Sequence, residues 1–568
     1  MKKLAYIMIP LLLLSMVVTT ITNETYIKNK INSSAQANLE MPRIRILQAS
    51  TIKYIDYLGP TAIILTHHED YWQDKIYRFS ELVKDRFKNT TIIISNSDPM
   101  IKMLYDYPDK AQFFAYYADL YILLNPYDSP LEQEEIIALQ SAFENGKSVM
   151  ITGNYYSYFE PEYLNPLTSK YGVTWFDDQV EDQTDYDHRT YYPLIHTWKT
   201  NEIAAILTNG VSNVKTHRST ALNVSTEVNG TEVIQYIIGT GDSDTYVDYN
   251  SDVIAGENII VYMAILHNSG GKMFLSGSTS FLTDGQYYIE SFDNELFVNN
   301  TLNWFKQDIK VYPNNISVPE ILPIGQSYSI YINITNEDST DRDVNVSLSI
   351  INLDSNANVE LDQNLVQLGT ISAGSYKNFY VNAQAHAPGK VLLLVQVTAK
   401  STTEPNDVIT YQKVVPLEAV SLKVSLSPQF SLLSLAKKNK VNVTVTVENP
   451  TPIDSTNTKL FINVKTGDPS GFKVTNTTID LGTITAGTSK QVEVELEFTK
   501  EGDYEVAFSA NSTEFTEPST AIFKAKVYSR PVAIFDNYHP TYYTAYRLKN
   551  LTLFLNESFD VWLGIPTI

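Results

Sequence analysis

The stretch LGTISAG at residues 368–374 decides how this chain is divided, because it returns 113 positions later as LGTITAG at residues 481–487. The same offset relates Asn336 to Asn449. Alternating apolar and polar residues precede each shared asparagine, which is typical of β-strands, and the glycines of each stretch bracket a tight corner. Two tandem all-β units of about 110 residues each are therefore predicted, of the immunoglobulin-like sandwich class.

A second repeat lies outside the first and is incomplete. Ala62-Ile63, His68, Tyr71 and Trp72 recur in spacing and chemistry as Ala533-Ile534, His539, Tyr542 and Tyr543. The second copy ends at Ile568, about 35 residues after it begins. The predicted multidomain plan is a linker at 23–53, an α/β domain at 54–308, sandwiches at 309–419 and 420–528, and the start of a second α/β domain at 529–568, incomplete.

Composition and charge narrow the classes of partner. With 568 residues and 43% hydrophobic residues, the chain is long enough for several domains that each bury a core. Its formal net charge of −22 opposes broad contact with phosphate backbones or anionic lipid surfaces, so nucleic acid is not expected as a partner. No cofactor is expected either, because no residue set compels a catalytic mechanism.

The first 22 residues predict export. Lys2 and Lys3 precede an apolar run from Leu4 to about Ile21, which is the layout of a signal peptide or an N-terminal membrane anchor. The small-residue pattern Ala35-Gln36-Ala37 lies too far from this run for an ordinary cleavage site, so release and retention in the membrane both stay open. An extracellular, cell-surface location is the interpretation.

Sequons and the cysteine count agree with an exported protein. The chain has no cysteine, so its domains depend on ordinary hydrophobic cores instead of disulfides. The candidate glycosylation sites in Asn-X-Ser/Thr sequons are Asn89, Asn223, Asn229, Asn299, Asn315, Asn333, Asn345, Asn442, Asn476, Asn511 and Asn550.

Residues 54–308 alternate short apolar runs with helical patterns, which predicts an open, flavodoxin-like sheet with helices on its faces. A helix is predicted after Pro130, because Glu132, Glu134 and Glu135 occupy its first turn and Gly146 stands at its end. The predicted strands are 61–65, 91–94, 120–124, 148–152, 233–239, 258–266 and 272–276, the last two forming an antiparallel pair; a helix is predicted over 72–87.

Two segments of this domain resemble a known family. The first is GKMFLSGSTSFL at residues 271–282, followed by Asn294, Asn300, Asn303 and Trp304; the second is YGVTWFDD at residues 171–178, continuing through Val180 and Asp182 to Pro193-Leu194-Ile195. Together they resemble the closing strand, closing helix and middle segment of the class I glutamine-amidotransferase-like domain. The similar branch is the non-catalytic one found in an intraflagellar transport subunit, in gliding-motility transporter accessory proteins and in DUF4350 proteins.

The resemblance implies a fold without its usual chemistry. True amidotransferases of that fold carry a cysteine nucleophile at a sharp turn after a strand. The matching turn here is Thr152-Gly153-Asn154-Tyr155, and Asn154 supplies no nucleophile comparable to a thiolate. Amidotransferase chemistry is therefore excluded, and the chain is interpreted as a non-enzyme.

Three groups of residues are candidate binding sites, and each has an ordinary alternative. His68 and Glu69, beside His67 and Asp70, follow the first strand at the edge where open α/β sheets bind ligands, although a polar loop would look the same. Asn154 with Tyr155, Tyr156, Tyr158 and Tyr163 could stack on a sugar or grip a partner loop, or pack on the sheet. Asp177, Asp178 and Asp182 could hold a hard metal ion such as calcium, or form a solvated acidic face.

The interpretation is an exported surface recognition or scaffolding protein, with a surface protein or glycan as partner. One rival is an extracellular hydrolase of glycans that uses carboxylates such as Glu160 and Asp177. Another is an accessory subunit of a membrane transporter, implied by the family alone. The segment 529–568 is predicted either to be the stub of a missing domain or to mediate self-association, because a strand without a sheet exposes unpaired edges.

Overall fold

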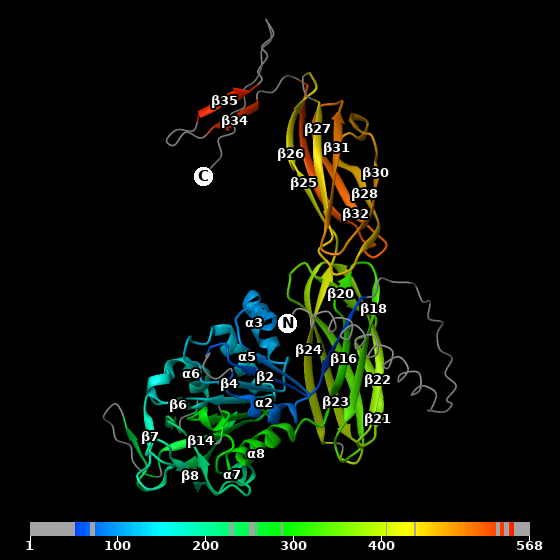
Figure 1. Cartoon of the computed structure of the whole chain (residues 1–568). Helices are drawn as coiled ribbons and strands as arrows, with labels where there is room; N and C mark the ends of the chain where they lie inside the picture. The colour runs from blue at the N-terminus through cyan, green and yellow to red at the C-terminus, as the bar shows by residue number, and fades with distance from the viewer. Residues whose placement is uncertain are drawn as a thin grey trace, which may run out of the picture. The chain divides into compact units, whose positions relative to one another are not determined.

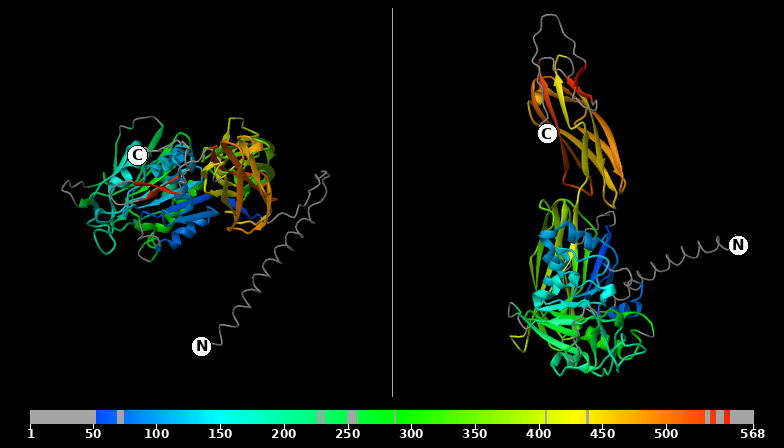
Figure 2. Two further views of the ribbon diagram at one scale, coloured as in Figure 1. Left: turned by 90° about the horizontal axis from the view of Figure 1, so that it is seen from above. Right: turned by 90° about the vertical axis from the view of Figure 1, so that its left-hand side faces the viewer.

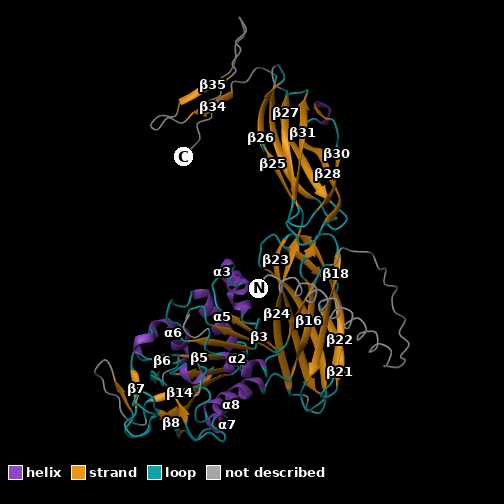
Figure 3. Ribbon diagram, viewed as in Figure 1, coloured by secondary structure: helices purple, strands orange, loops and turns teal. Residues whose placement is uncertain are grey.

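The computed structural model describes residues 52–68, 74–225, 228, 232–248, 256, 258–285, 288–404, 406–436 and 439–529, and the backbone of 534–538 and 545–549. All of these belong to one compact unit that begins at Ser50. Figure 1 labels its elements, and Figure 3 shows that the helices gather in the part before the two sandwiches, apart from one short turn in the second sandwich. The predicted signal or anchor segment lies outside the described residues. Within the described residues, no helix has both the length and the apolar run that crossing a membrane requires.

The first domain is built on a mixed sheet. Strands β3, β2, β4, β5 and β15 are parallel and hydrogen-bonded in that order, and β14 follows antiparallel to β15. Every residue of β2, β4, β5 and β15 is buried, as expected for parallel strands covered on both faces. The strands are β2 (Thr61–Leu65), β3 (Asn89–Ile93), β4 (Leu120–Leu124), β5 (Ser148–Thr152), β6 (Val173–Trp175), β7 (Gln179–Glu181), β8 (Leu194–Ile195), β9 (Thr197–Trp198), β10 (Val214–Lys215), β11 (Leu222–Val224), β12 (Val233–Thr240), β13 (Tyr246–Asp248), β14 (Ile260–His267) and β15 (Lys272–Ser276).

Helices cover both faces of this sheet. Along β2, Ala62 and Ile64 belong to one buried cluster, whereas Ile63 and Leu65 belong to the other, because successive strand residues point to opposite faces. Helices α2, α7 and α8 pack in the first cluster, and α3, α5 and α6 in the second. The helices are α2 (Tyr77–Lys84), α3 (Pro99–Asp106), α4 (Ala111–Phe114), α5 (Gln133–Glu144), α6 (Pro161–Thr168), α7 (Glu202–Leu207) and α8 (Asn294–Lys306), with 3-10 turns η2 (Pro108–Lys110), η3 (Tyr156–Tyr158), η4 (Ser169–Tyr171) and η5 (Ser280–Leu282).

One strand lies in a different domain from the one that its sequence position indicated. β1 (Tyr54–Leu58) falls inside the segment 54–308 that was assigned to the α/β domain, yet it pairs antiparallel with β16 at the edge of the first sandwich. It presents mostly exposed residues, unlike the buried strands of the α/β sheet. The chain therefore contributes a strand to the first sandwich before it forms the α/β domain.

Two β-sandwiches follow, each with two sheets around its own core. Figure 2 shows their strands from two further directions. The first pairs β1-β16-β18-β22-β20 with β17-β24-β23-β19-β21, and the second pairs β25-β27-β31-β29 with β26-β33-β32-β28-β30. The strands are β16 (Val311–Pro319), β17 (Leu322–Pro323), β18 (Ser327–Asn336), β19 (Arg342–Asn352), β20 (Asn358–Leu361), β21 (Leu365–Ile371), β22 (Tyr376–Ala387), β23 (Gly389–Ser401), β24 (Val408–Val420), β25 (Lys423–Ser427), β26 (Phe430–Ser434), β27 (Lys440–Glu448), β28 (Ser455–Thr466), β29 (Phe472–Val474), β30 (Thr478–Ile484), β31 (Ser489–Phe498), β32 (Gly502–Asn511) and β33 (Ser519–Tyr528), with η6 (Pro469–Gly471).

The repeat of 113 positions extends to single hydrogen bonds. The Asn336 amide donates to the carbonyl oxygens of Thr340 and Ile371, and the Asn449 amide donates to those of Ile453 and Ile484, which are the same positions in the second unit. Both asparagines are fully buried. The spacing that is repeated within this sequence therefore reflects a corner shared by both units. In that corner the asparagine amide forms hydrogen bonds that join the end of one strand to the end of another.

Glycine is required at the corners of both units for a conformational reason. Gly369 has φ 61° and Gly482 has φ 62°, and the pair Gly374 and Gly487 have φ 69° and 67°. An L-residue with a side chain rarely adopts this left-handed region, whereas glycine does so at little cost. The quoted stretches are therefore alike because both units need the same backbone turn.

A buried polar cluster joins the α/β domain to the first sandwich. Asp119 accepts hydrogen bonds from Lys147 Nζ at 2.9 Å, from the Thr61 amide at 2.9 Å and from the Tyr411 hydroxyl at 2.9 Å. Lys413 Nζ donates to the carbonyl oxygen of Leu58 at 3.1 Å. Tyr411 and Lys413 lie on β24, so these contacts cross from the sheet of one domain to the sheet of the other.

The tail contains a short hairpin. β34 (Ile534–Tyr538) pairs antiparallel with β35 (Ala545–Lys549). Of the repeated residues in this segment, Ala533, His539, Tyr542 and Tyr543 lie outside the described residues. Both a missing domain and self-association through 529–568 therefore stay predictions.

Candidate functional site at the carboxyl edge of the α/β sheet

The order of the parallel strands reverses beside β2. From β2 the chain proceeds to β3 on one side and then to β4 on the other, so the loops after β2 and β4 leave the sheet in opposite directions. In open α/β sheets this reversal creates a crevice at the carboxyl ends of the strands, where ligands bind. His67 and His68 follow β2, and Glu135 stands in the first turn of α5, which follows β4.

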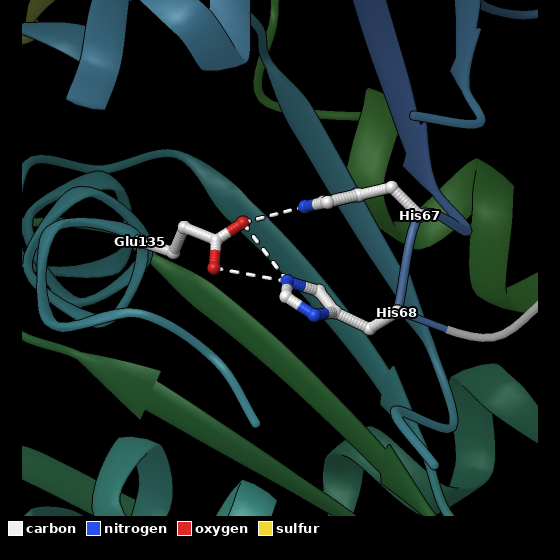
Figure 4. Close-up of side chains that lie close together, drawn as sticks. All are labelled: His67, His68 and Glu135. Atoms are coloured by element: carbon white, nitrogen blue, oxygen red, sulfur yellow. Dashed lines mark hydrogen bonds and ion pairs between the residues drawn. The ribbon is translucent and has the colours of Figure 1, made fainter. Parts of the chain in front are cut away.

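His67, His68 and Glu135 converge at this reversal, as Figure 4 shows. His67 Nε2 lies 2.6 Å from Glu135 Oε1, and His68 Nε2 lies 2.9 Å from Glu135 Oε2. The side chains are 0%, 3% and 3% exposed, respectively. Burial raises the pKa of the Glu135 carboxyl, but hydrogen bonds from both imidazoles outweigh it and hold that pKa at about 2. The group is therefore a buried carboxylate between two imidazole rings.

The sequence pointed to part of this group only. His68 was a candidate ligand-binding residue, and the structure brings it to Glu135, whereas Glu69 lies outside the described residues. Glu135 served as a helix-start signal, and it does accept a hydrogen bond from the Glu132 amide at 2.8 Å. Nothing local in the sequence indicates that this capping residue also faces two histidines 67 and 68 positions away.

The turn after β5 holds Asn154 where the resemblance places the nucleophile. Asn154 is 7% exposed, and its Oδ1 accepts a hydrogen bond from the Tyr155 amide at 3.0 Å. A side chain at Gly153 would lie 3.0 Å from Trp175 Nε1, so the backbone approaches the neighbouring ring closely. The turn is closed by its own asparagine, which has no group able to attack a carbonyl carbon as a thiolate does.

Three of the four candidate tyrosines gather beside this turn. The Tyr155 ring lies 5.3 Å from that of Tyr156 and 5.4 Å from that of Tyr158, and Tyr158 also lies 5.8 Å from Tyr127. Tyr158 is 49% exposed, which leaves aromatic surface open to solvent. Tyr163 lies on α6 and is half-buried. The exposed part of the group is therefore centred on Tyr158.

Arg218 completes this aromatic group, although it is not among the ligand-binding residues predicted from the sequence. Its guanidinium lies 4.6 Å from the centre of the Tyr155 ring and 5.0 Å from that of Tyr191, and it donates a hydrogen bond to the Tyr155 hydroxyl. Arg218 has φ 55°, an uncommon conformation for a residue other than glycine. Among the described residues no carboxylate lies within ion-pair distance of Arg218.

The residues before Arg218 add no further positive charge to it, because Lys215 is paired with a carboxylate and His217 is neutral. Lys215 lies in the same segment, and its ammonium contacts Asp187 at 2.5 Å. Burial lowers the pKa of the adjacent His217 to about 4, with further lowering by Arg218 and Lys215. Thr216 Oγ1, His217 Nε2 and Arg218 Nε are buried without hydrogen-bond partners among the described residues. The basic run from Lys215 to Arg218 in a chain of net charge −22 was the sequence signal that could have identified this segment.

The three aspartates that were predicted as metal ligands are in different environments. Asp177 is exposed, whereas Asp178 is buried and accepts hydrogen bonds from Thr220 Oγ1 at 2.7 Å and the Ala221 amide at 2.9 Å. Burial raises the pKa of Asp178 to about 6 in spite of those hydrogen bonds. Asp182 has ligand atoms close to those of Asp242 and Asp244 instead. Asp182 therefore has other neighbours than the two aspartates that precede it in the sequence.

The sequons differ in accessibility. Asn223, Asn345, Asn442 and Asn476 are exposed, whereas Asn333 is only 8% exposed. Asn89, Asn299, Asn315 and Asn511 are half-buried, and Asn229 and Asn550 lie outside the described residues. Exposure therefore favours the first four as glycan acceptors.

Comparisons with known proteins add no family. No family model and no curated protein match the chain. Among solved structures, the mmIFT52 N-terminal domain is similar over 43% of this chain and 97% of its own, with 12% identity and a TM-score of 0.33. Red sea bream transglutaminase is similar over 51% of this chain and 39% of its own, with 12% identity and a TM-score of 0.20. The native conformation of E. coli alpha-2-macroglobulin is similar over 54% of this chain and 22% of its own, with 10% identity and a TM-score of 0.22. Scores below 0.5 carry no conclusion about fold or function.

Proposed function

We propose that the chain is an exported, cell-surface recognition protein, in which a non-catalytic amidotransferase-like domain is carried on two immunoglobulin-like sandwiches. We further propose that it binds glycans that carry carboxylate groups, at the surface formed by Tyr158, Tyr191 and Arg218, whose guanidinium lies beside the buried ring of Tyr155. The observation that carries the proposal is the guanidinium of Arg218, stacked between the Tyr155 and Tyr191 rings without a carboxylate partner among the described residues.

The chemistry of this surface suits an acidic sugar. A guanidinium offers a planar fork of donors that matches a carboxylate, and stacking on aromatic rings holds that fork in place. Tyrosine rings offer apolar area for the faces of a sugar ring and a hydroxyl for its polar groups. Because the protein as a whole is strongly acidic, an anionic ligand is attracted only where the local charge is positive, as at the guanidinium of Arg218.

The test is binding of glucuronic-acid-containing oligosaccharides to the purified chain, compared with neutral glucose oligosaccharides of equal length. We expect the acidic series to bind and Arg218→Met to weaken its affinity by about 10- to 100-fold, which corresponds to a lost charge-assisted hydrogen bond. Arg189→Met is the matched control, since Arg189 is exposed and lies 5.7 Å from the same Tyr191 ring. Equal binding of neutral and acidic sugars, or unchanged affinity in Arg218→Met, would contradict the proposed ligand.

The surface location has its own test. An impermeant amine-reactive label added to intact cells should modify exposed lysines such as Lys423, which is 70% exposed. Labelling that occurs only after the cells are broken would contradict a surface location, whatever the outcome of the sugar-binding measurement.

A hydrolase is the second candidate, and one observation favours it. Burial raises the pKa of Glu160, and the neighbouring carboxylates of Glu162 and Asp177 raise it further. Burial and Glu162 likewise raise the pKa of Asp177. Glycoside hydrolysis uses a pair of carboxyl groups, of which one is a general acid with a raised pKa and the other acts as a carboxylate. Release of reducing ends from the acidic oligosaccharides, abolished by Glu160→Gln and by Asp177→Asn, would establish this alternative and refute a purely binding role.

A further inference from the structure

His67, His68 and Glu135 supply three metal-capable atoms at one point. The two imidazoles come from consecutive residues at the end of β2, and the carboxylate comes from the first turn of α5. Besides the contacts of 2.6 and 2.9 Å, His68 Nε2 lies 3.1 Å from Glu135 Oε1. One ligand atom from each residue can be chosen so that all three lie within 4.8 Å of one another.

This spacing approaches that of a zinc coordination shell. Nitrogen and oxygen ligands at about 2.0–2.2 Å around a tetrahedral zinc ion lie about 3.4 Å from one another. The imidazole-to-carboxylate distances of 2.6, 2.9 and 3.1 Å are shorter than this by about 0.3 to 0.8 Å, because hydrogen bonds now join the same atoms. Coordination of an ion therefore requires the imidazoles and the carboxylate to move apart from their hydrogen-bonded positions. Two imidazoles and one carboxylate form a ligand set that leaves a fourth position open.

Neighbouring groups hold two of the three ligands in the orientation that coordination needs. His68 Nδ1 lies 2.8 Å from Ser129 Oγ, so that Nδ1 can donate to the hydroxyl while Nε2 coordinates. The Glu132 amide donates to Glu135 Oε2 at 2.8 Å. Such outer hydrogen bonds fix the tautomer of a ligating histidine and the orientation of a ligating carboxylate.

Two further observations point to a cation at this place. His67 Nδ1 is buried without a hydrogen-bond partner among the described residues, so the hydrogen bonding of this ring there is through Nε2 alone. Among the same residues, no lysine or arginine forms an ion pair with Glu135. The group also lies at the β2/β4 reversal, where this class of sheet binds its ligands.

We propose that His67, His68 and Glu135 bind one divalent transition-metal ion of the zinc type. Imidazole and carboxylate ligands suit zinc, and the absence of cysteine from the chain removes the softer thiolate ligands. This proposal does not depend on the recognition function, because the tyrosines and Arg218 take no part in it. The competing explanation is a metal-free hydrogen-bonded group that only joins the end of β2 to the start of α5.

The experiment is a titration of the full chain with zinc chloride after dialysis against a chelator, followed by calorimetry and by elemental analysis of the protein after desalting. We expect one tightly held zinc ion per chain. Glu135→Gln keeps an oxygen that can accept the Glu132 amide hydrogen bond, but it should abolish tight binding. Ser129→Ala, which removes only the outer hydrogen bond, should weaken binding by about 10- to 100-fold.

The chain offers a matched control. His267 Nε2 lies 3.2 Å from a Glu232 carboxylate oxygen, and its Nδ1 lies 2.7 Å from Ser269 Oγ. This histidine therefore has the same types of partner as His68, a carboxylate and a serine hydroxyl, but no second histidine beside them. His267→Gln should leave zinc binding unchanged. Tryptophan fluorescence of each variant shows whether the α/β domain is folded, and substitution with cobalt gives a visible spectrum that reports the ligand set in the unmodified chain.

The outcomes separate the two explanations. Absence of a tightly held zinc ion in the unmodified chain would overturn the proposal, as would equal zinc affinity in the unmodified chain and a folded Glu135→Gln variant. If Glu135→Gln does not fold, the effect of Ser129→Ala on affinity and the cobalt spectrum decide the question: no change on Ser129→Ala together with a spectrum of six oxygen ligands would refute the assignment.

Discussion

Replacing Asp178 by asparagine tests whether the α/β domain keeps a charge buried at a cost to its stability. Asp178 is 4% exposed, and burial raises the pKa of its carboxyl from the ordinary 3.8 to about 6. Both of its hydrogen-bond donors, Thr220 Oγ1 and the Ala221 amide, reach Oδ1. An asparagine can accept both hydrogen bonds through the same oxygen without carrying the charge.

The magnitude follows from linkage between protonation and folding. Between pH 3.8 and about 6 the folded chain binds more protons at Asp178 than the unfolded chain, so the free energy of unfolding falls as pH rises through this window. At 1.36 kcal/mol per pH unit, the complete loss is about 3 kcal/mol. Asp178→Asn should abolish this loss, so the stability of the variant relative to the unmodified chain should rise by about that amount between pH 4 and pH 7.

Urea unfolding followed by tryptophan fluorescence is the assay. None of the five tryptophans lies between residues 309 and 529, so the signal does not come from the sandwiches. Asp85→Asn, at an exposed aspartate of the same domain, is the control and should not alter the pH dependence. A stability difference between the unmodified chain and Asp178→Asn that stays constant within about 0.5 kcal/mol from pH 4 to pH 7 would refute the reasoning.

Three further predictions concern the sandwiches and the junction between domains. Asn336→Ala and Asn449→Ala should each lower the stability of their own sandwich by about 2–4 kcal/mol, because two buried carbonyls lose their donor in each case; calorimetry that shows less than about 0.5 kcal/mol for either would contradict the shared role. Asp119→Asn should lower the free energy of unfolding by about 3–5 kcal/mol, since Lys147 and Lys413 then lack their buried counter-charge. An effect on urea unfolding that is smaller than that of Asp85→Asn would contradict this prediction. Burial lowers the pKa of Lys413 to about 8, so the folded chain binds fewer protons there between pH 8 and 10.5 and stability should rise with pH; Lys413→Met should remove that rise, and an unchanged slope would show that Lys413 does not cause it.

The elements that the sequence predicted best are those with strong local patterns. The strands predicted at 61–65, 120–124, 148–152 and 272–276 match β2, β4, β5 and β15. Each is a short apolar run between polar loops, so its burial can be inferred from neighbours in the sequence. Predicted and observed boundaries differ where the pattern is mixed: the helix predicted over 72–87 is described over Tyr77–Lys84, and the strand predicted over 91–94 is Asn89–Ile93.

The candidate site was predicted only in part. His68 and the tyrosine-rich turn were identified because they follow strands at the edge of the sheet where ligands bind. Glu135 and Arg218 were not, because each acquires its neighbours from segments tens of residues away. Arg218 meets Tyr155 across 63 positions of sequence. A periodic pattern contains no information on such a meeting.

The sequence by itself therefore determined the repeating architecture: two units offset by 113 positions, with glycines where a left-handed turn is needed and an asparagine where two strand ends are tied. These features depend on local backbone conformation and on the alternation of burial along a strand, which each segment carries within itself. Only the tertiary structure decided that β1 pairs with a strand of the first sandwich and that two histidines face the first turn of α5. It also decided that Asp182 lies near Asp242 and Asp244. Those outcomes depend on which distant surfaces pack together, and packing is settled by the whole chain at once.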